Sequence, residues 1–250
     1  MLRVVRHGTP TGRPKLLIAH GLFGSARNWG AIARRLADER EVLAVDMRNH
    51  GESFWDATHD YPAMAGDLAA VIEAEGAPMD VMGHSMGGKA AMALALTRPA
   101  LVGKLVVLDI APVAYSHTQR AQLDAMRRVD LATVASRREA EEAMMAASPA
   151  VAAFLGQSLD LPARRWRLNL DALEANMPLI VGWPGFEGRF EGPALFLSGE
   201  LSDYVRPEHR EAIKALFPRA AFAKVRGAGH WLHADRPREV EGAVRAFLDA

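Results

Sequence analysis

The stretch GHSMG at 83–87 places a serine between two glycines, in a context where the serine hydroxyl could do chemistry. The apolar run at 79–82 before it predicts a strand, and the alanine-rich segment 86–98 after it predicts a helix. Ser85 is therefore expected at a sharp strand-to-helix turn, where glycines two residues before and after the serine avoid steric collision. A hydroxyl held beside the positive end of a helix is suited to nucleophilic attack.

A serine hydroxyl is a weak nucleophile unless a base accepts its proton, so a histidine is expected at the same edge of the fold. His230 lies in the segment RGAGHW at 226–231, after a predicted strand at 221–225 and before the last predicted helix. His233 is the next candidate for the base. A metal site built from His230, His233 and Asp235 is conceivable, but no second ligand cluster supports it, so we expect no metal.

Acyl transfer also needs backbone N–H groups that face the carbonyl oxygen as it becomes charged. One donor should be Met86, the residue after the nucleophile. The other should come from the loop HGLFGS at 20–25, which follows a predicted strand at 16–19. We expect the Leu22 N–H to be this donor and the neighbouring Phe23 to line the pocket. Three loops that each follow a predicted strand thus carry the parts of one site.

The elements that must position these loops are short apolar strands alternating with helices. Unbroken apolar runs of four or five residues suit strands that are covered on both faces. The alternation predicts an α/β fold with a mostly parallel central sheet flanked by helices. The last segment, 235–250, is expected to form a helix with Asp235 as its N-cap. The predicted strands are 16–19, 42–45, 79–82, 105–108, 194–197 and 221–225, and the predicted helices between them include 30–39, 62–75 and 86–98.

Residues 113–192 break this alternation, because about 80 residues pass without a convincing strand. Helical patterns occur there at 119–128, 137–147 and 164–175. A helical excursion between two parallel strands would emerge at the carboxyl edge of the sheet, where ligands bind in such folds. We therefore expect 1–112 and 193–250 to form the core domain and 113–192 to form a helical cap, or lid, inserted before the last strands.

The composition excludes several classes of protein. The 250 residues are 50% hydrophobic, and 30 basic residues balance 30 acidic ones, so nothing favours binding to nucleic acid or to an anionic membrane. Cysteine is absent, which excludes a thiolate nucleophile and a cysteine-based metal site. The N-terminus lacks the apolar core of a signal peptide, and no stretch is long enough to span a membrane. We expect a cytoplasmic protein with a small-molecule substrate, whose oligomeric state the sequence does not indicate.

Five blocks of the sequence together resemble the α/β-hydrolase superfamily over essentially the whole chain. Within it, they are most similar to the YbfF-type bacterial esterases of the abhydrolase-domain family. The resemblance implies an esterase or thioesterase that acts on acyl chains, with a helical cap over the site and no cofactor. The blocks are HGLFGS at 20–25, VDMRNHGES at 45–53, GHSMGGKAAMALAL at 83–96, LDIAPV at 108–113 and GAGHWLHADRP at 227–237.

Two aspartates compete for the acidic position of a Ser-His-Asp triad. In most of the superfamily the acid follows the strand that corresponds to 194–197, but Ser202 stands at that place and Asp203 comes one residue later. In the YbfF-type esterases the acid comes from the end of the preceding strand, which matches Asp109. Both candidates fit the chain order Ser, Asp, His. We favour Asp109 and keep Asp203 as the alternative.

The turn at 46–50 and two side chains near the nucleophile are expected to have structural roles. The turn contains Asp46 and Arg48 and resembles one that buttresses the nucleophile loop. Lys89, on the helix that follows Ser85, could contact a ligand, but a single lysine on a helix is more often solvated surface, and this is the expectation. His84 is expected to be packed in the turn.

Several aromatic side chains fall in the predicted loops or the cap, where they could form an apolar slot for an acyl chain or belong to the cap core. These candidates for substrate binding are Phe23, Tyr115, Trp183, Phe186 and Trp231.

The favoured function is hydrolysis of short to medium acyl esters or thioesters through an acyl-enzyme on Ser85, with His230 as base and then acid. Two other reactions use the same triad, namely hydrolysis of carbon–carbon bonds and cofactor-free perhydrolysis. A binding or receptor protein of low turnover that keeps the hydrolase fold is the alternative from another class.

Overall fold

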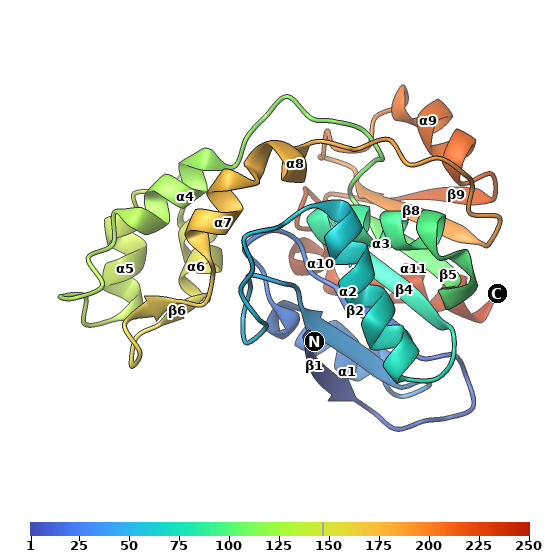
Figure 1. Ribbon diagram of the computed structural model, residues 1–250, viewed down its shortest axis with the longest axis horizontal. Helices are drawn as coiled ribbons and strands as arrows, with labels where there is room; N and C mark the ends of the chain where they lie inside the picture. Colours follow the sequence, from blue (N-terminus) through green and yellow to red (C-terminus); the bar gives the residue numbers. More distant parts are fainter. Residues whose placement is uncertain (147) are drawn as a thin grey trace.

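A seven-stranded sheet forms the centre of the computed structural model, which describes residues 1–146 and 148–250 (Figure 1). Its strand order is β1-β3-β2-β4-β5-β8-β9, and every neighbouring pair is parallel except β1 with β3. The predicted α/β architecture with a mostly parallel sheet is therefore confirmed. The strands are β1 (Arg3–His7), β2 (Leu16–Ala19), β3 (Val42–Asp46), β4 (Met79–His84), β5 (Val102–Leu108), β8 (Ala194–Gly199) and β9 (Ala220–Val225).

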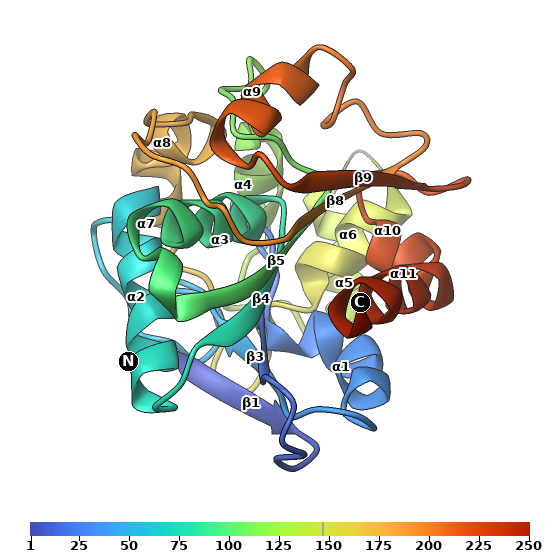
Figure 2. The same cartoon turned by 90° about the vertical axis from the view of Figure 1, so that its right-hand side faces the viewer.

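Helices cover both faces of this sheet (Figure 2). On one face α1 (Gly30–Leu36) contacts α11 (Pro237–Asp249), and on the other α2 (Tyr61–Ala74) contacts α3 (Met86–Thr97). Two separate apolar clusters fill the two interfaces, and β2, β3 and β4 are buried along their whole length. Burial on both faces explains why these strands read as unbroken apolar runs.

The chain leaves the sheet after β5 and returns at β8, and the elements between them lie mostly to one side of the core (Figure 1). They are α4 (Arg120–Arg127), α5 (Arg137–Met144), α6 (Pro149–Gly156), β6 (Leu159–Asp160), β7 (Arg165–Trp166), α7 (Leu170–Ala175) and α8 (Met177–Val181). Because β2, β4, β5, β8 and β9 are parallel, the loops at their carboxyl ends meet at one edge of the sheet.

The structure differs from the sequence expectations at several elements. β1 was not expected; it is an antiparallel edge strand whose two arginines are exposed, so it lacks an apolar run. Residues 164–169 are not helical, because β7 pairs there with β6. α9 (His209–Leu216), between β8 and β9, and the short α10 (Leu232–Asp235) were not expected.

The final helix begins at Pro237, so Asp235 is not its N-cap. The Asp235 carboxylate instead accepts a hydrogen bond from the Gly229 amide at 2.8 Å.

Across the described ranges, no helix combines the length and apolar character that a bilayer crossing requires.

Candidate active site

Ser85 occupies the turn between β4 and α3 in a strained conformation with a positive φ of 51° and a ψ of −119°. A Cβ atom on Gly87 would lie 2.5 Å from the carbonyl oxygens of both Ala19 and His20, so only glycine fits there. A Cβ on Gly83 would in turn collide with the Gly87 carbonyl. The expected reason for the two glycines is thus confirmed, and the serine hydroxyl is held at the carboxyl edge of the sheet.

His230 lies between Ser85 and Asp109. Its Nε2 is 3.1 Å from the Ser85 Oγ, and its Nδ1 is 2.7 Å from the Asp109 Oδ2. Each residue comes from a different strand end, since Ser85 follows β4, Asp109 follows β5 and His230 follows β9. Asp203 is exposed, and it has no polar contact with His230 among the described residues; its carbonyl accepts a hydrogen bond from Arg206.

The Asp109 carboxylate is fully buried and accepts hydrogen bonds from three directions. The Gly199 amide donates to Oδ1 at 2.9 Å, while Oδ2 faces His230 Nδ1 and accepts a hydrogen bond from the Ser202 hydroxyl. These contacts fix the carboxylate against the imidazole. Sequence reasoning assigned no role to Ser202, although it noted a serine where an acid was expected.

Tyr204 is a second contact that sequence reasoning missed. Its ring stacks on the imidazole of His230, with centroids 3.8 Å apart and planes 16° apart. Its hydroxyl is 2.8 Å from His117 Nε2, and its carbonyl accepts a hydrogen bond from the Tyr115 hydroxyl. The loop after β8 thus holds the face of the His230 ring. No local motif marks Tyr204, because the contact joins two distant loops.

The loop that follows β2 passes directly against Ser85. A Cβ on Gly21 would lie 2.8 Å from His84 Nδ1 and 3.3 Å from the Ser85 Cβ. In the part of the chain that the structure describes, neither the Leu22 nor the Met86 amide donates a hydrogen bond. Both amides thus make no hydrogen bond within the described residues, and Leu22, Ser85 and Met86 line the same cavity.

Two buried histidines tie this loop to the turn after β3. The Met47 amide donates to His20 Nε2 at 2.9 Å, and the Phe23 amide donates to His50 Nε2 at 3.1 Å. The Nδ1 atoms of the two rings therefore carry the protons, and that of His50 donates to the Arg48 carbonyl. Burial lowers the pKa of His20 to about 4 and that of His50 to about 3, so both are neutral at pH 7.

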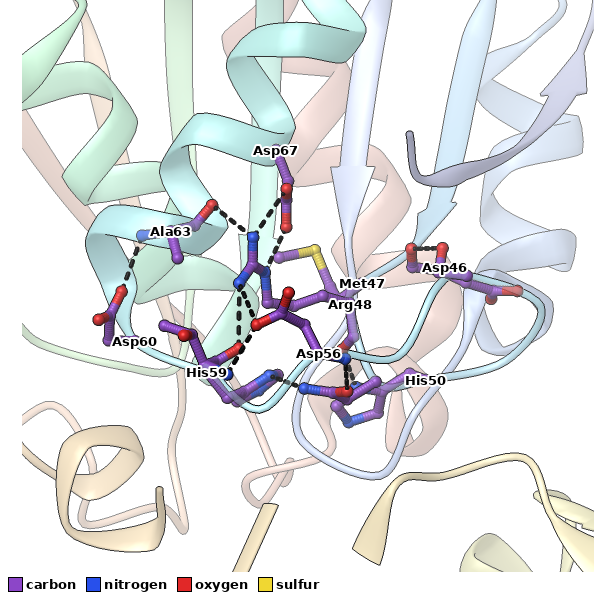
Figure 3. Close-up of polar contacts among 12 residues, drawn as sticks. Asp46, Met47, Arg48, His50, Asp56, His59, Asp60, Ala63 and Asp67 are labelled. Carbon is purple, nitrogen blue, oxygen red and sulfur yellow. Dashed lines mark hydrogen bonds and ion pairs between the residues drawn. The ribbon is translucent and has the colours of Figure 1, made fainter. Parts of the chain in front are cut away.

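The turn after β3 is itself anchored by charged side chains (Figure 3). The Arg48 guanidinium binds the Asp67 carboxylate on α2, with Nε 2.5 Å from Oδ2. The Asp46 carboxylate accepts hydrogen bonds from the amides of Ala26 and Glu52. The structural role predicted for this turn is confirmed, but the segment it holds in place is the loop after β2 rather than the nucleophile loop.

The match to a protein family agrees with this geometry. The family model described as the alpha/beta hydrolase fold matches residues 14–237. The chain belongs to the α/β-hydrolase fold family.

Individual relatives of this α/β-hydrolase carry esterase and lipase names. Esterase YbfF of Escherichia coli K12 is 38% identical over 246 residues, which cover 94% of this chain and 92% of that protein. The mouse protein named sn-1-specific diacylglycerol lipase ABHD11 is 38% identical over 248 residues, 94% of this chain and 81% of its own. A solved structure titled marine microorganism esterase has a TM-score of 0.93 and 34% identity, and the match covers 98% of both chains. The resemblance to YbfF-type esterases is confirmed, and these names support a hydrolase of the esterase type.

A cavity of the α/β-hydrolase lies over Ser85 and His230. Phe23, Tyr115 and Trp231 line it, as their positions led us to expect. The structure does not bring Trp183 and Phe186 to the same wall; their rings lie 5.1 Å apart and pack on each other. Sequence reasoning missed the α6 side chains Val151, Phe154 and Leu155, and the polar residues Gln119 and Gln122, all of which line the cavity.

Lys89 is not on the surface, contrary to expectation. It is 1% exposed, lines the cavity, and donates hydrogen bonds to the carbonyls of Val181 and Gly182. Helix α3 is buried on all sides from Met86 to Leu96, so every position on it faces protein.

The two other histidines near the nucleophile have structural contacts. His84 is buried as expected, and its Nε2 donates to the His230 carbonyl at 2.9 Å. His233 stacks on Trp29 with centroids 4.4 Å apart. Over residues 1–146 and 148–250, no three side chains of histidine, aspartate or glutamate are grouped in a way that suits a metal ion.

Proposed function

We propose that this protein is a serine esterase that hydrolyses short to medium acyl esters or thioesters through an acyl-enzyme on Ser85. The observation that carries the proposal is the His230 imidazole, with Nε2 3.1 Å from the Ser85 Oγ and Nδ1 2.7 Å from the Asp109 carboxylate. A base within hydrogen-bonding distance of a serine, itself held by an acid, is the arrangement that acyl transfer requires. The esterase and lipase names of the relatives support the same reaction class.

In the first half of the reaction, the Ser85 Oγ attacks the ester carbonyl while His230 Nε2 takes the hydroxyl proton. The buried Asp109 carboxylate stabilises the imidazolium that forms and keeps the Nδ1 proton in place. The Leu22 and Met86 amides bind the oxygen as it becomes negative. His230 then gives the proton to the leaving alcohol or thiol, which departs and leaves an acyl-Ser85 ester.

In the second half, a water molecule takes the place of the leaving group. His230 Nε2 removes its proton, the resulting hydroxide attacks the acyl carbonyl, and the same two amides stabilise the second tetrahedral intermediate. The proton returns to the Ser85 Oγ as the carboxylic acid leaves. Only Ser85 and His230 change their protonation state in this cycle.

Residues 113–192 act in this proposal as a cap that bounds the acyl pocket. Apolar side chains from α6, Val151, Phe154 and Leu155, line one wall of the cavity. The Tyr61 hydroxyl on α2 donates to the Ile180 carbonyl on α8, which ties the returning segment to the core. A water-excluding apolar wall strengthens the electrostatic interactions with the oxyanion and favours acyl chains.

Burst kinetics with p-nitrophenyl butyrate test the acyl-enzyme. Wild type should release a burst of p-nitrophenolate equal to the enzyme concentration if deacylation is slower than acylation, followed by steady turnover. Ser85→Ala should abolish both phases while keeping the wild-type circular dichroism spectrum. Steady turnover that survives in folded Ser85→Ala would rule out the proposed nucleophile.

A matched pair of variants tests the acid. Asp109→Asn should lower kcat by about 10³-fold to 10⁴-fold, since the His230 tautomer is no longer fixed by a carboxylate. Asp203→Asn should leave kcat within about twofold, because Asp203 is exposed and makes no polar contact with His230 among the described residues. The reverse result would assign the role to Asp203.

A further inference from the structure

Lys89 lies one helical turn beyond Ser85 in the same cavity. Its amide donates to the Ser85 carbonyl at 3.0 Å, as expected for an i, i+4 pair. Side chains on a helix lean toward its N-terminus, so the Lys89 stem extends toward the nucleophile rather than away from it. The residue is 1% exposed, and both it and Ser85 line the cavity. A lysine has thus been buried at the site of the chemistry.

The ammonium has two hydrogen-bond acceptors and no counter-charge. Its Nζ donates to the carbonyls of Val181 at 3.0 Å and Gly182 at 2.6 Å. It also lies 4.7 Å from the ring centroid of Tyr115 and 5.6 Å from that of Tyr61. Among the described residues, no carboxylate lies within ion-pair distance of Lys89. An ammonium has three N–H donors, so one of them makes no hydrogen bond within the part of the chain that the structure describes.

Burying a cation without a counter-ion costs free energy, and this cost disfavours the protonated form of the lysine. Burial lowers the pKa of Lys89 to about 7, and no opposing interaction offsets the desolvation. Other buried cations of this protein are paired, as Arg40 is with Asp80 at 3.0 Å. An anion brought into the cavity would restore the missing pairing and the third hydrogen bond.

A further unsatisfied polar group lies in the same cavity. The Gln122 Oε1 atom on α4 is buried and has no hydrogen-bond partner among the described residues, while the Gln119 Nε2 donates a long hydrogen bond of 3.4 Å to the Tyr204 hydroxyl. The cavity therefore combines the apolar wall of α6 with polar groups that a purely hydrocarbon ligand would leave unsatisfied.

We propose that Lys89 is a specificity-determining residue that binds a carboxylate carried by the substrate in addition to the ester group. The preferred substrates are then carboxylate-bearing esters or thioesters, such as half-esters of dicarboxylic acids. This inference rests on the proposed function, because it takes the cavity over Ser85 to be the place where the ester is hydrolysed. The Val181 and Gly182 carbonyls hold the ammonium in place, and the substrate carboxylate accepts its third N–H.

The test compares charged and neutral esters of the same shape. With the carboxylate in the acyl half, monoethyl succinate, glutarate and adipate are paired with ethyl 4-methylpentanoate, 5-methylhexanoate and 6-methylheptanoate, in which an isopropyl group replaces the carboxylate. With the carboxylate in the alcohol half, carboxymethyl butyrate is paired with isobutyl butyrate. Acid release is titrated at pH 7, and the discrimination factor is the ratio of kcat/KM for the charged ester to that for the neutral one.

Wild type should show a discrimination factor above one for at least one pair. Lys89→Met removes the charge at similar volume and should lower this factor by about tenfold or more, the effect of losing one buried charge-assisted hydrogen bond. Lys104→Met is the matched control. The Lys104 Nζ also donates to two carbonyls, those of Phe247 and Leu248, and lies near an aromatic ring, but it does not line the cavity. Its discrimination factor should equal that of wild type.

Any one of four results would overturn the inference. Wild type that prefers the neutral ester in every pair refutes it without any variant, so the test stands even where Lys89→Met fails to fold. A folded Lys89→Met that loses activity toward both members of a pair in equal proportion shows that Lys89 only ties the cap to α3. Absence of all ester hydrolysis in wild type refutes the proposed function as well, whereas hydrolysis without a preference refutes this inference alone.

Discussion

Acidification should unfold this protein through the three buried histidines behind the loop after β2. His20, His50 and His59 are at most 1% exposed, and burial is the largest cause that lowers their pKa values, to about 4, 3 and 2. Nε2 of His20 now accepts a hydrogen bond from the Met47 amide, and Nε2 of His50 accepts one from the Phe23 amide. A proton added to either Nε2 atom would point at that amide hydrogen and break the hydrogen bond. The folded state therefore resists protonation that the unfolded chain accepts.

The sign and size of the effect follow from linkage. Between the folded pKa values and the unfolded value near 6.5, the unfolded chain binds more protons, so stability is complete above pH 6.5 and falls as the pH decreases. From pH 7 to pH 5 each histidine costs about 2 kcal/mol, and the three together cost on the order of 5 kcal/mol. A domain of this kind has a free energy of unfolding of about 5–15 kcal/mol, so the three histidines should remove about a third of it or more by pH 5.

Urea unfolding at half-unit steps between pH 7 and pH 5, followed by circular dichroism and tryptophan fluorescence, measures this dependence. Near pH 5.5 the slope should be at least about 3 kcal/mol per pH unit, equivalent to more than two protons taken up on unfolding. His59→Met keeps an apolar side chain against Met86, whose sulfur lies 3.3 Å from His59 Nε2, and should lower the slope by about one proton. A free energy of unfolding that changes by less than about 1 kcal/mol over this range would refute the argument, because buried neutral histidines could not then be present.

Three further changes test other parts of the structure. Gly87→Ala places a Cβ 2.5 Å from two carbonyl oxygens and should lower kcat by about 100-fold or more, because Ser85 is shifted. Gly66→Ala, in open space on α2, should instead raise the free energy of unfolding by about 0.5–1 kcal/mol. A Gly87→Ala variant with wild-type kcat would contradict the steric argument. Arg40→Met leaves the buried Asp80 carboxylate without its ion-pair partner and should lower the free energy of unfolding in urea by about 3 kcal/mol. The kcat should not change, because Asp80 lies in β4 near the end opposite Ser85. A loss of stability below about 1 kcal/mol would argue against this pairing. Burial lowers the pKa of Lys89 in the folded state from its usual 10.5 to about 7, so between these values the unfolded chain binds one proton more. The free energy of unfolding of wild type should therefore rise by about 2 kcal/mol through this group between pH 7 and pH 9. Lys89→Met should lack this rise, and a variant with the same pH dependence as wild type would show that the lysine is not buried.

The sequence alone predicted the nucleophile turn and the layered α/β fold, because both depend on local patterns. Gly83 and Gly87 around Ser85 mark a turn whose crowding is set by neighbouring backbone. Strands buried on both faces must be apolar throughout, so β2, β3 and β4 could be recognised from their residue types. β1 lacked this mark, since it is an edge strand with exposed arginines.

Only the tertiary structure determined which groups meet across distant elements. Asp109 and Asp203 both fitted the chain order, and the contact of Asp109 with His230 depends on the positions of β5 and β9 in the sheet. Residues 113–192 depart from the sheet, so the sequence could not place their aromatic side chains relative to the cavity, and Trp183 and Phe186 lie elsewhere.

Lys89 shows the physical reason most clearly. Its residue type predicted a solvated position, but α3 is covered by the sheet, by α2 and by the segment at 181–182 that leads back toward β8, so the helix has no exposed face from Met86 to Leu96. Burial is a property of the whole packing around a residue, and helical periodicity specifies only which side chains share a face. Residue types and spacing thus determined the candidate nucleophile, the candidate base and the sheet, whereas packing decided which aspartate meets His230, which side chains line the cavity and that Lys89 is buried.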